Sequence, residues 1–108
     1  MMHVVKIKPV SVNDAYTGRR FATRELKGFK ELLMWMLPKI DMPEGRLEVW
    51  YEFGVSKNSD GDNCQKAFQD ALSAQYGFND RMIYAWHGRK VDVPKGKEYV
   101  GFEIRAMV

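Results

Sequence analysis

The fold is decided by residues 46–72, which read RLEVWYEFGVSKNSDGDNCQKAFQDAL. Residues 46–55 alternate apolar and polar side chains, the pattern of a strand with one face against a core. From residue 63 the apolar side chains instead recur every three or four positions, which predicts a helix over 63–76. The apolar face of that helix consists of Cys64, Ala67, Phe68, Ala71 and Leu72.

Similar patterns predict elements on both sides of this stretch. We expect strands over residues 3–8, 82–91 and 99–107 and a helix over residues 23–37. The Pro/Gly turn at residues 92–97 predicts that the last two strands pair as a hairpin. The expected fold is therefore α+β: a small mixed β-sheet with two main helices in the order β-α-β-α-β-β, forming a single domain over residues 1–108.

The helix predicted over residues 23–37 begins at Thr23, a good N-cap residue, and is ended by Pro38. Its apolar stripe, which should face the core, consists of Leu26, Phe29, Leu33, Met36 and Leu37. The run Met34, Trp35, Met36 is interpreted as core or as a contact between two copies of the chain.

Composition places the chain among ordinary globular proteins. It has 108 residues, of which 45% are hydrophobic and 29% charged, and a net charge of +3 that is compatible with nucleic acid. One cysteine allows no intrachain disulfide and fits a reducing compartment. The longest apolar run, residues 32–37, is far too short to span a membrane. We expect no membrane partner and a cytoplasmic location in a bacterial or phage-infected cell.

Acidic residues around the start and end of the helix over 63–76 indicate a metal site. Asp60 and Asp62 flank Gly61, and Asp80 follows the helix. Carboxylate oxygens are the ligands that Mg²⁺ and Mn²⁺ prefer, and so few of them leave positions for water and a substrate phosphate. Lys66 shares a helix face with Asp62 and could stabilise charge on that phosphate. The set suits phosphodiester hydrolysis.

A second interpretation of the same residues needs no metal. The run Asp60-Gly61-Asp62-Asn63 is also ordinary turn and N-cap chemistry, and Lys66 with Asp70 forms a common surface pair. The chain would then be a non-catalytic α+β protein that binds nucleic acid or a protein partner. From spacing alone both interpretations remain open.

The motif resembles a known family. Residues 59–72, SDGDNCQKAFQDAL, followed by GFND at 77–80, resemble the signature D-x-D-N-x-x-K-x-x-x-D-A-L and G-[hydrophobic]-x-D of the RusA family of Holliday junction resolvases. Residues 9–16, PVSVNDAY, are similar to that family's P-x-S-x-N-x-x-Y element. The order and spacing agree over about residues 6–104.

The resemblance implies a function and a set of roles. Asp60, Asp62 and Asp80 match the family's catalytic, metal-associated aspartates, and Lys66 matches its catalytic lysine. The implied enzyme is a homodimeric, RusA-like endonuclease that resolves Holliday junctions in DNA recombination and repair. It would nick four-way junction DNA symmetrically with Mg²⁺ as cofactor, or with Mn²⁺ as an alternative.

Basic and polar side chains predict where the DNA would bind. Cations outnumber acids in residues 19–30 and 89–97, and the long polar segment 11–20 carries groups that bind phosphate or stack on bases. Such charged faces are also often only solvated. The predicted DNA-binding residues are Asn13, Tyr16, Arg19, Arg20, Lys57, Arg89 and Lys90.

The length of the helix raises a geometric question. About 14 residues extend about 21 Å, so Asp80 should lie far from Asp60 and Asp62. Three explanations would still bring them together: a shorter helix, a chain that doubles back, or a two-fold axis that pairs the helix start of one subunit with the helix end of its partner.

Overall fold

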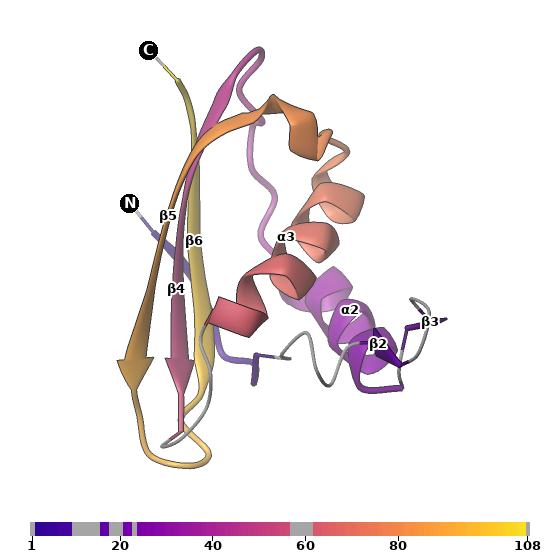
Figure 1. Cartoon of the computed structure of the whole chain (residues 1–108), viewed down its shortest axis with the longest axis vertical. Helices are drawn as coiled ribbons and strands as arrows, with labels where there is room; N and C mark the ends of the chain where they lie inside the picture. Colours follow the sequence, from indigo (N-terminus) through magenta and orange to yellow (C-terminus); the bar gives the residue numbers. More distant parts are fainter. Residues whose placement is uncertain (1, 10–15, 18–20, 23, 57–61, 108) are drawn as a thin grey trace.

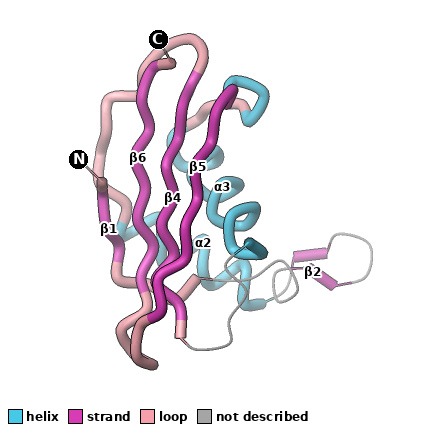
Figure 2. The backbone as a smooth tube through the Cα atoms, turned by 60° about the vertical axis from the view of Figure 1, so that its left-hand side comes forward, coloured by secondary structure: helices cyan, strands magenta, loops and turns pink. Residues whose placement is uncertain are grey.

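The computed structural model describes residues 2–9, 16–17, 21–22, 24–56 and 62–107, with the backbone alone for residues 16, 17, 21, 22, 25, 26, 62 and 63. A four-stranded mixed sheet carries two α-helices on one face (Figures 1 and 2). The predicted α+β class is therefore confirmed. In chain order the described elements are β1 (His3–Val5), β2 (Tyr16–Thr17), β3 (Phe21–Ala22), α2 (Arg24–Met36), β4 (Leu47–Val55), α3 (Asp62–Tyr76), the 3₁₀ turn η1 (Asp80–Met82), β5 (Ile83–Asp92) and β6 (Tyr99–Ala106).

The predicted hairpin between the last two strands is wrong. The strand order is β1-β6-β4-β5, so β5 and β6 lie on opposite sides of β4. β4 pairs in parallel with β5 and antiparallel with β6. Strands two positions apart are separated by about 10 Å, which a six-residue turn can cross. The turn is held against the end of β4, because the Val93 N–H donates to the Val55 carbonyl at 2.9 Å.

β4 is the central strand, and its alternation is as predicted. The side chains of Leu47, Val49, Tyr51, Phe53 and Val55 are all buried. From Val49 onward they lie in the core cluster together with the buried side chains of α2 and α3. The intervening side chains, including Trp50 and Glu52, belong to the opposite face of the sheet, which the helices leave uncovered (Figure 1).

α3 contributes the apolar stripe that the sequence predicts. Cys64, Ala67, Phe68, Ala71 and Leu72 are all buried. The Phe68 ring is central, since it makes edge-on contacts with four other rings at centroid distances of 5.7 to 6.4 Å: Phe29, Tyr51, Phe53 and Phe102. The core is therefore a layer of aromatic side chains between the sheet and its two helices.

α2 is only partly as predicted. Phe29 and Leu33 are buried, but Met34, Trp35 and Met36 are 57%, 86% and 41% exposed. The interpretation of these three as core residues is wrong, because the helix turns only the narrow stripe through Phe29 and Leu33 towards the sheet. Their role in a contact between two copies stays a prediction.

The first part of the chain differs from the prediction in its extent. β1 ends at Val5, although Ile7 is still buried and its N–H donates to the Val5 carbonyl at 2.9 Å. The segment expected to be a loop contains β2, which pairs antiparallel with β3. Among the described residues, no helix is both long enough and apolar enough to cross a membrane.

Candidate functional site

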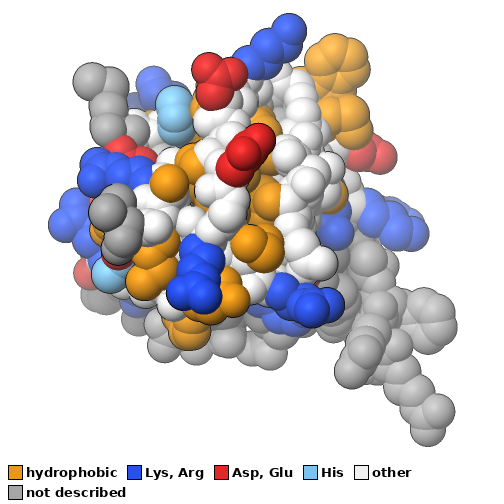
Figure 3. Space-filling model, turned by 90° about the horizontal axis from the view of Figure 1, so that it is seen from above, with side chains coloured by type: hydrophobic (Ala, Val, Ile, Leu, Met, Phe, Trp, Pro, Cys, Tyr) orange, Lys and Arg blue, Asp and Glu red, His pale blue; other side chains and the backbone are white. Residues whose placement is uncertain are grey.

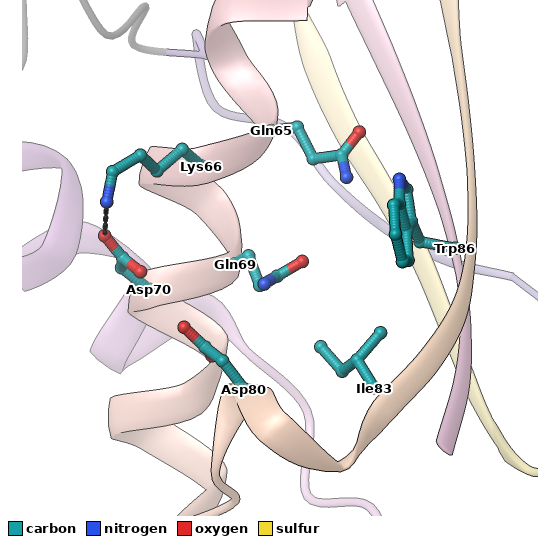
Figure 4. Close-up of a pocket in the computed structure, with 7 residues that line it drawn as sticks. All are labelled: Gln65, Lys66, Gln69, Asp70, Asp80, Ile83 and Trp86. Atoms are coloured by element: carbon teal, nitrogen blue, oxygen red, sulfur yellow. Dashed lines mark ion pairs between the residues drawn. The ribbon is translucent and has the colours of Figure 1, made fainter. Parts of the chain in front are cut away.

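An open pocket of about 580 Å³ lies between α3 and β5, with η1 at one end (Figure 4). Its α3 wall carries polar side chains from the flank of the buried stripe, and its other wall carries an aliphatic and an aromatic side chain. The lining residues are Gln65, Lys66, Gln69, Asp70, Asp80, Ile83 and Trp86. The pocket therefore brings two carboxylates and one ammonium group to the same surface.

Asp80 reaches this pocket because the chain turns back at the end of α3. Gly77 ends the helix with a φ of +71°, a conformation that glycine adopts without steric cost, and its N–H donates to the Ser73 carbonyl. The Ser73 hydroxyl then donates to the Phe78 carbonyl. The Asn79 side chain caps η1 by accepting from the Arg81 N–H at 2.9 Å. The chain therefore does turn back after α3, while the side chains of Asp60 and Asp62, which the three explanations were to bring to Asp80, lie outside the described residues.

Lys66 and Asp70 are one helical turn apart on α3. The Lys66 Nζ lies 3.6 Å from Asp70 Oδ2, and the Lys66 side chain is 63% exposed. Such an exposed pair adds only about 0.3–0.5 kcal/mol to stability. Figure 4 shows the Lys66 side chain extending to Asp70, on the side of α3 away from Trp86.

Tyr51 connects the pocket to the core. Its hydroxyl donates to Gln69 Oε1 at 3.0 Å, and its side chain is only 2% exposed. Burial raises the pKa of the Tyr51 hydroxyl well above its ordinary value of 10.0, and the negative charges of Asp80 and then Asp70 add to the rise. Both carboxylates are therefore close enough to influence the same buried phenol.

Tyr51→Phe should change the dependence of stability on pH. Because the folded protein disfavours the phenolate, the contribution of Tyr51 is complete below its ordinary pKa of 10.0 and is lost as the pH rises above it. Wild type should lose up to about 1.4 kcal/mol more per pH unit than Tyr51→Phe in that range. Near pH 7 the variant should instead be less stable by about 0.5–1.5 kcal/mol, through loss of the bond to Gln69. Urea denaturation across this pH range measures both; equal slopes would contradict the assignment.

The predicted catalytic residues are described to different extents. Lys66 and Asp80 line the same pocket. Asp62 is the first residue of α3, where the structure describes the backbone alone, and Asp60 lies outside the described residues. Asp62, Lys66 and Asp70 follow each other at intervals of four residues, which places all three positions along one side of α3.

The predicted DNA-binding residues are spread over the chain. Asn13, Arg19, Arg20 and Lys57 lie outside the described residues, and Tyr16 is in β2 with its backbone alone described. Arg89 pairs with Glu52 on the face of the sheet away from α3. Lys90 lies beside Phe53 in the register of β4 and β5, on the helix side.

Charge on the surface is mixed rather than gathered. On the face shown in Figure 3, Lys and Arg side chains lie apart from one another, with apolar and acidic side chains between them. A DNA backbone laid on this face would meet separate cations rather than one continuous basic patch. Among the described residues that line the pocket, Lys66 is the one cation.

Five of the seven residues that line the pocket were not predicted as site residues: Gln65, Gln69, Asp70, Ile83 and Trp86. Asp70 was interpreted only as the partner of Lys66, and Gln69 and Trp86 were not singled out. Gln69 shares the solvent side of α3 with Lys66, which is visible in the helical periodicity. Trp86 carries no such signal, because its place depends on the parallel pairing of β5 with β4.

The described residues supply part of a metal site. Asp70 and Asp80 offer the hard oxygen ligands that Mg²⁺ prefers, and the open pocket leaves room for water and phosphate oxygens. Within the ranges that the structure describes, no group of three or more His, Cys, Asp and Glu side chains is arranged to hold a metal ion. A complete set would need the carboxylates of Asp60 and Asp62.

Compared with known proteins, the chain matches no protein-family model and no curated protein.

Proposed function

We propose that this chain is a metal-dependent endonuclease, RusA-like in its motif, that nicks four-way junction DNA. The observation that supports the proposal is the reversal at Gly77, which brings Asp80 to the open pocket that Lys66 and Asp70 also line. A carboxylate from a separate turn and an ammonium group from a helix thus line one pocket, although 14 positions separate them in the sequence. Structural turn and cap residues have no need to share a pocket in this way.

Each residue has a role in the proposed reaction. Asp60, Asp62 and Asp80 would hold Mg²⁺, or Mn²⁺, which when bound polarises the scissile phosphate and activates the attacking water. Lys66 donates to the phosphate oxygens as negative charge develops on them. Asp70 acts through Lys66, since the ion pair restricts the positions of the flexible ammonium group. The exposed position of Asp80 would let a metal ion that it holds contact a DNA phosphate.

The DNA contacts extend beyond the pocket. Lys90 lies on the same side of β5 as the pocket and would contact phosphates flanking the cleaved one. Arg89 faces the other way and would bind a separate arm of the junction. Lys57 and the residues of segment 11–20 that were predicted to bind DNA complete the proposed interface.

Paired nicks need two sites, so we propose a homodimer. A two-fold axis would present one pocket to each of the two strands that are cut symmetrically. Asp80 acts in this proposal with Lys66 of its own subunit. Mixing an Asp80→Ala chain with an Asp60→Ala/Asp62→Ala chain tests that point. Sites formed within one subunit would leave the mixed dimer inactive, whereas sites shared across the dimer would give one wholly wild-type site and would restore nicking of one strand.

Cleavage of a synthetic junction tests the function. The protein is incubated with a labelled four-way junction, or with a linear duplex of the same sequence, with Mg²⁺ or with EDTA. We expect two symmetric nicks in the junction only when Mg²⁺ is present, and little cleavage of the duplex. Binding without cleavage in either Mg²⁺ or Mn²⁺ would refute the nuclease and favour a non-catalytic binding protein.

A further inference from the structure

The side chain of Trp86 exposes a large aromatic surface to solvent at the candidate site. Its side chain is 60% exposed although it stands opposite Val49, a fully buried residue of β4. β5 is the edge strand of the sheet, and Trp86 faces the open pocket between β5 and α3 rather than the core. A tryptophan side chain buries roughly 150–250 Å² in a core, so this position gives up a substantial stabilisation.

The wall opposite Trp86 consists of amides. The side chains of Gln65 and Gln69 extend from α3 towards β5, across the pocket from the indole (Figure 4). Gln65 has room because of Gly88, where a Cβ would lie 3.0 Å from its Oε1. The Gln69 oxygen already accepts from Tyr51, so the amide nitrogen is the group that Gln69 can offer a ligand. The space between these walls thus has one flat aromatic side and one hydrogen-bonding side.

We infer that this space holds an unpaired nucleobase, stacked on Trp86 with its edge towards Gln65 and Gln69. The inference rests on the proposed function, because it assigns the nucleotide next to the phosphate at Lys66 and Asp80. An aromatic face binds any base by stacking, and glutamine amides match the donors and acceptors of base edges. The same pocket is lined by the aromatic side chain, by the two glutamine amides and by the charged groups that would bind the phosphate of that nucleotide.

The consequence concerns which DNA is cut. A base inside a duplex is paired and stacked, and taking it out costs a few kcal/mol, least where the stacking is already disturbed. The exchange point of a four-way junction is such a place. Trp86 would therefore favour phosphates beside a branch over those in a linear duplex, without reading sequence strongly.

A binding measurement tests the inference without any cleavage. The variant Trp35→Phe/Trp50→Phe keeps Trp86 as its one tryptophan, since the chain has three. It is titrated in EDTA with a thymine oligonucleotide and with an abasic oligonucleotide of the same length, which carries the same phosphates. We expect the thymine strand to quench the fluorescence of Trp86 and the abasic strand to leave it nearly unchanged. Equal quenching by both strands would overturn the inference.

Affinity gives a second, independent readout. Trp86→Ala should raise the Kd for the thymine strand by about 5- to 100-fold and hardly change the Kd for the abasic strand. Trp86→Phe should keep most of the affinity, because it retains an aromatic face. Trp35→Ala, at an exposed tryptophan on α2, is the matched control and should bind as wild type does. Equal weakening for both strands, or none for either, would contradict base stacking.

The test separates this inference from the proposed function. Quenching that depends on bases, in a protein that cleaves no junction with Mg²⁺, would refute the nuclease alone. Magnesium-dependent cleavage of junctions with no selective quenching would refute the role of Trp86 alone.

Discussion

Replacing Asp80 with asparagine is expected to lower kcat for junction cleavage by at least about 100-fold, the scale of losing a preorganised charged group at a phosphoryl-transfer site. The change keeps the size of the side chain and removes one of the two described carboxylates in the pocket. Affinity for the junction, measured in EDTA, should stay equal or rise, because a negative charge facing the DNA phosphates is lost. Loss of cleavage with retained binding marks a catalytic role rather than a docking role.

The control for Asp80→Asn is Asp41→Asn, at an exposed residue in the segment between α2 and β4. It makes the same chemical change away from the pocket and should cleave at the wild-type rate. Both variants should unfold at the same urea concentration as wild type, since both positions are exposed. An Asp80→Asn protein that nicks junctions within a few-fold of wild type would remove Asp80 from the proposed mechanism.

The largest effect on stability is expected at Phe68. Phe68→Ala should lower the free energy of unfolding by about 3–5 kcal/mol, because it leaves a cavity where four aromatic rings converge on a fully buried side chain. Each lost edge-on ring contact adds to the cost of the cavity. Urea denaturation followed by circular dichroism measures the change.

A loss this large is a major part of the stability of a small domain, so Phe68→Ala alone could leave the protein unfolded. Phe68→Leu refills much of the cavity and should cost less while the fold is kept. Trp35→Ala, at a side chain that is 86% exposed, should change stability by no more than about 0.5 kcal/mol. A Phe68→Leu protein as stable as wild type would contradict the central place given to this ring.

Local periodicity predicts most of the core correctly. In β4 and α3 the spacing of apolar residues predicts which side of the element faces the core. Every residue predicted to face the core in these two elements is buried. These elements are long and have one buried face, so their pattern is strong. The exposed run on α2 shows the limit of composition: Met34 and Trp35 are apolar, but their position on the helix turns them to solvent.

Strand order is not a local property, which explains the wrong hairpin. The turn at residues 92–97 would fit either a direct pairing or a passage across one strand. Which of the two occurs depends on β4. The crossover through α3 places β5 parallel to β4 on one edge, and β6 pairs with the other edge. Two parallel strands need such a crossover connection, and the residues of the turn at 92–97 do not indicate that the preceding strand pair is parallel.

Two of the predicted site residues, Lys66 and Asp80, line one pocket, while metal binding and catalysis there stay predictions. The sequence predicts that Lys66 and Asp80 belong to one site. The length of the predicted helix, however, places Asp80 far from the residues at the start of that helix. The reversal depends on Gly77, which the sequence marks as a helix end, and on the bond from Ser73 to Phe78, which it does not mark. Trp86 joins the pocket only through strand pairing.

The sheet order has a consequence for synthesis on the ribosome. Of the described strands, β6 is made after all the others, yet it lies between β1 and β4 and pairs with both. At about 5–20 residues per second, the nascent chain must wait for residues 99–106 to emerge before β1 has this partner. Until then, one hydrogen-bonding edge of β4 has no partner strand. A ribosome stalled before residue 99 would therefore present an incomplete sheet with an exposed apolar face, to which chaperones would bind.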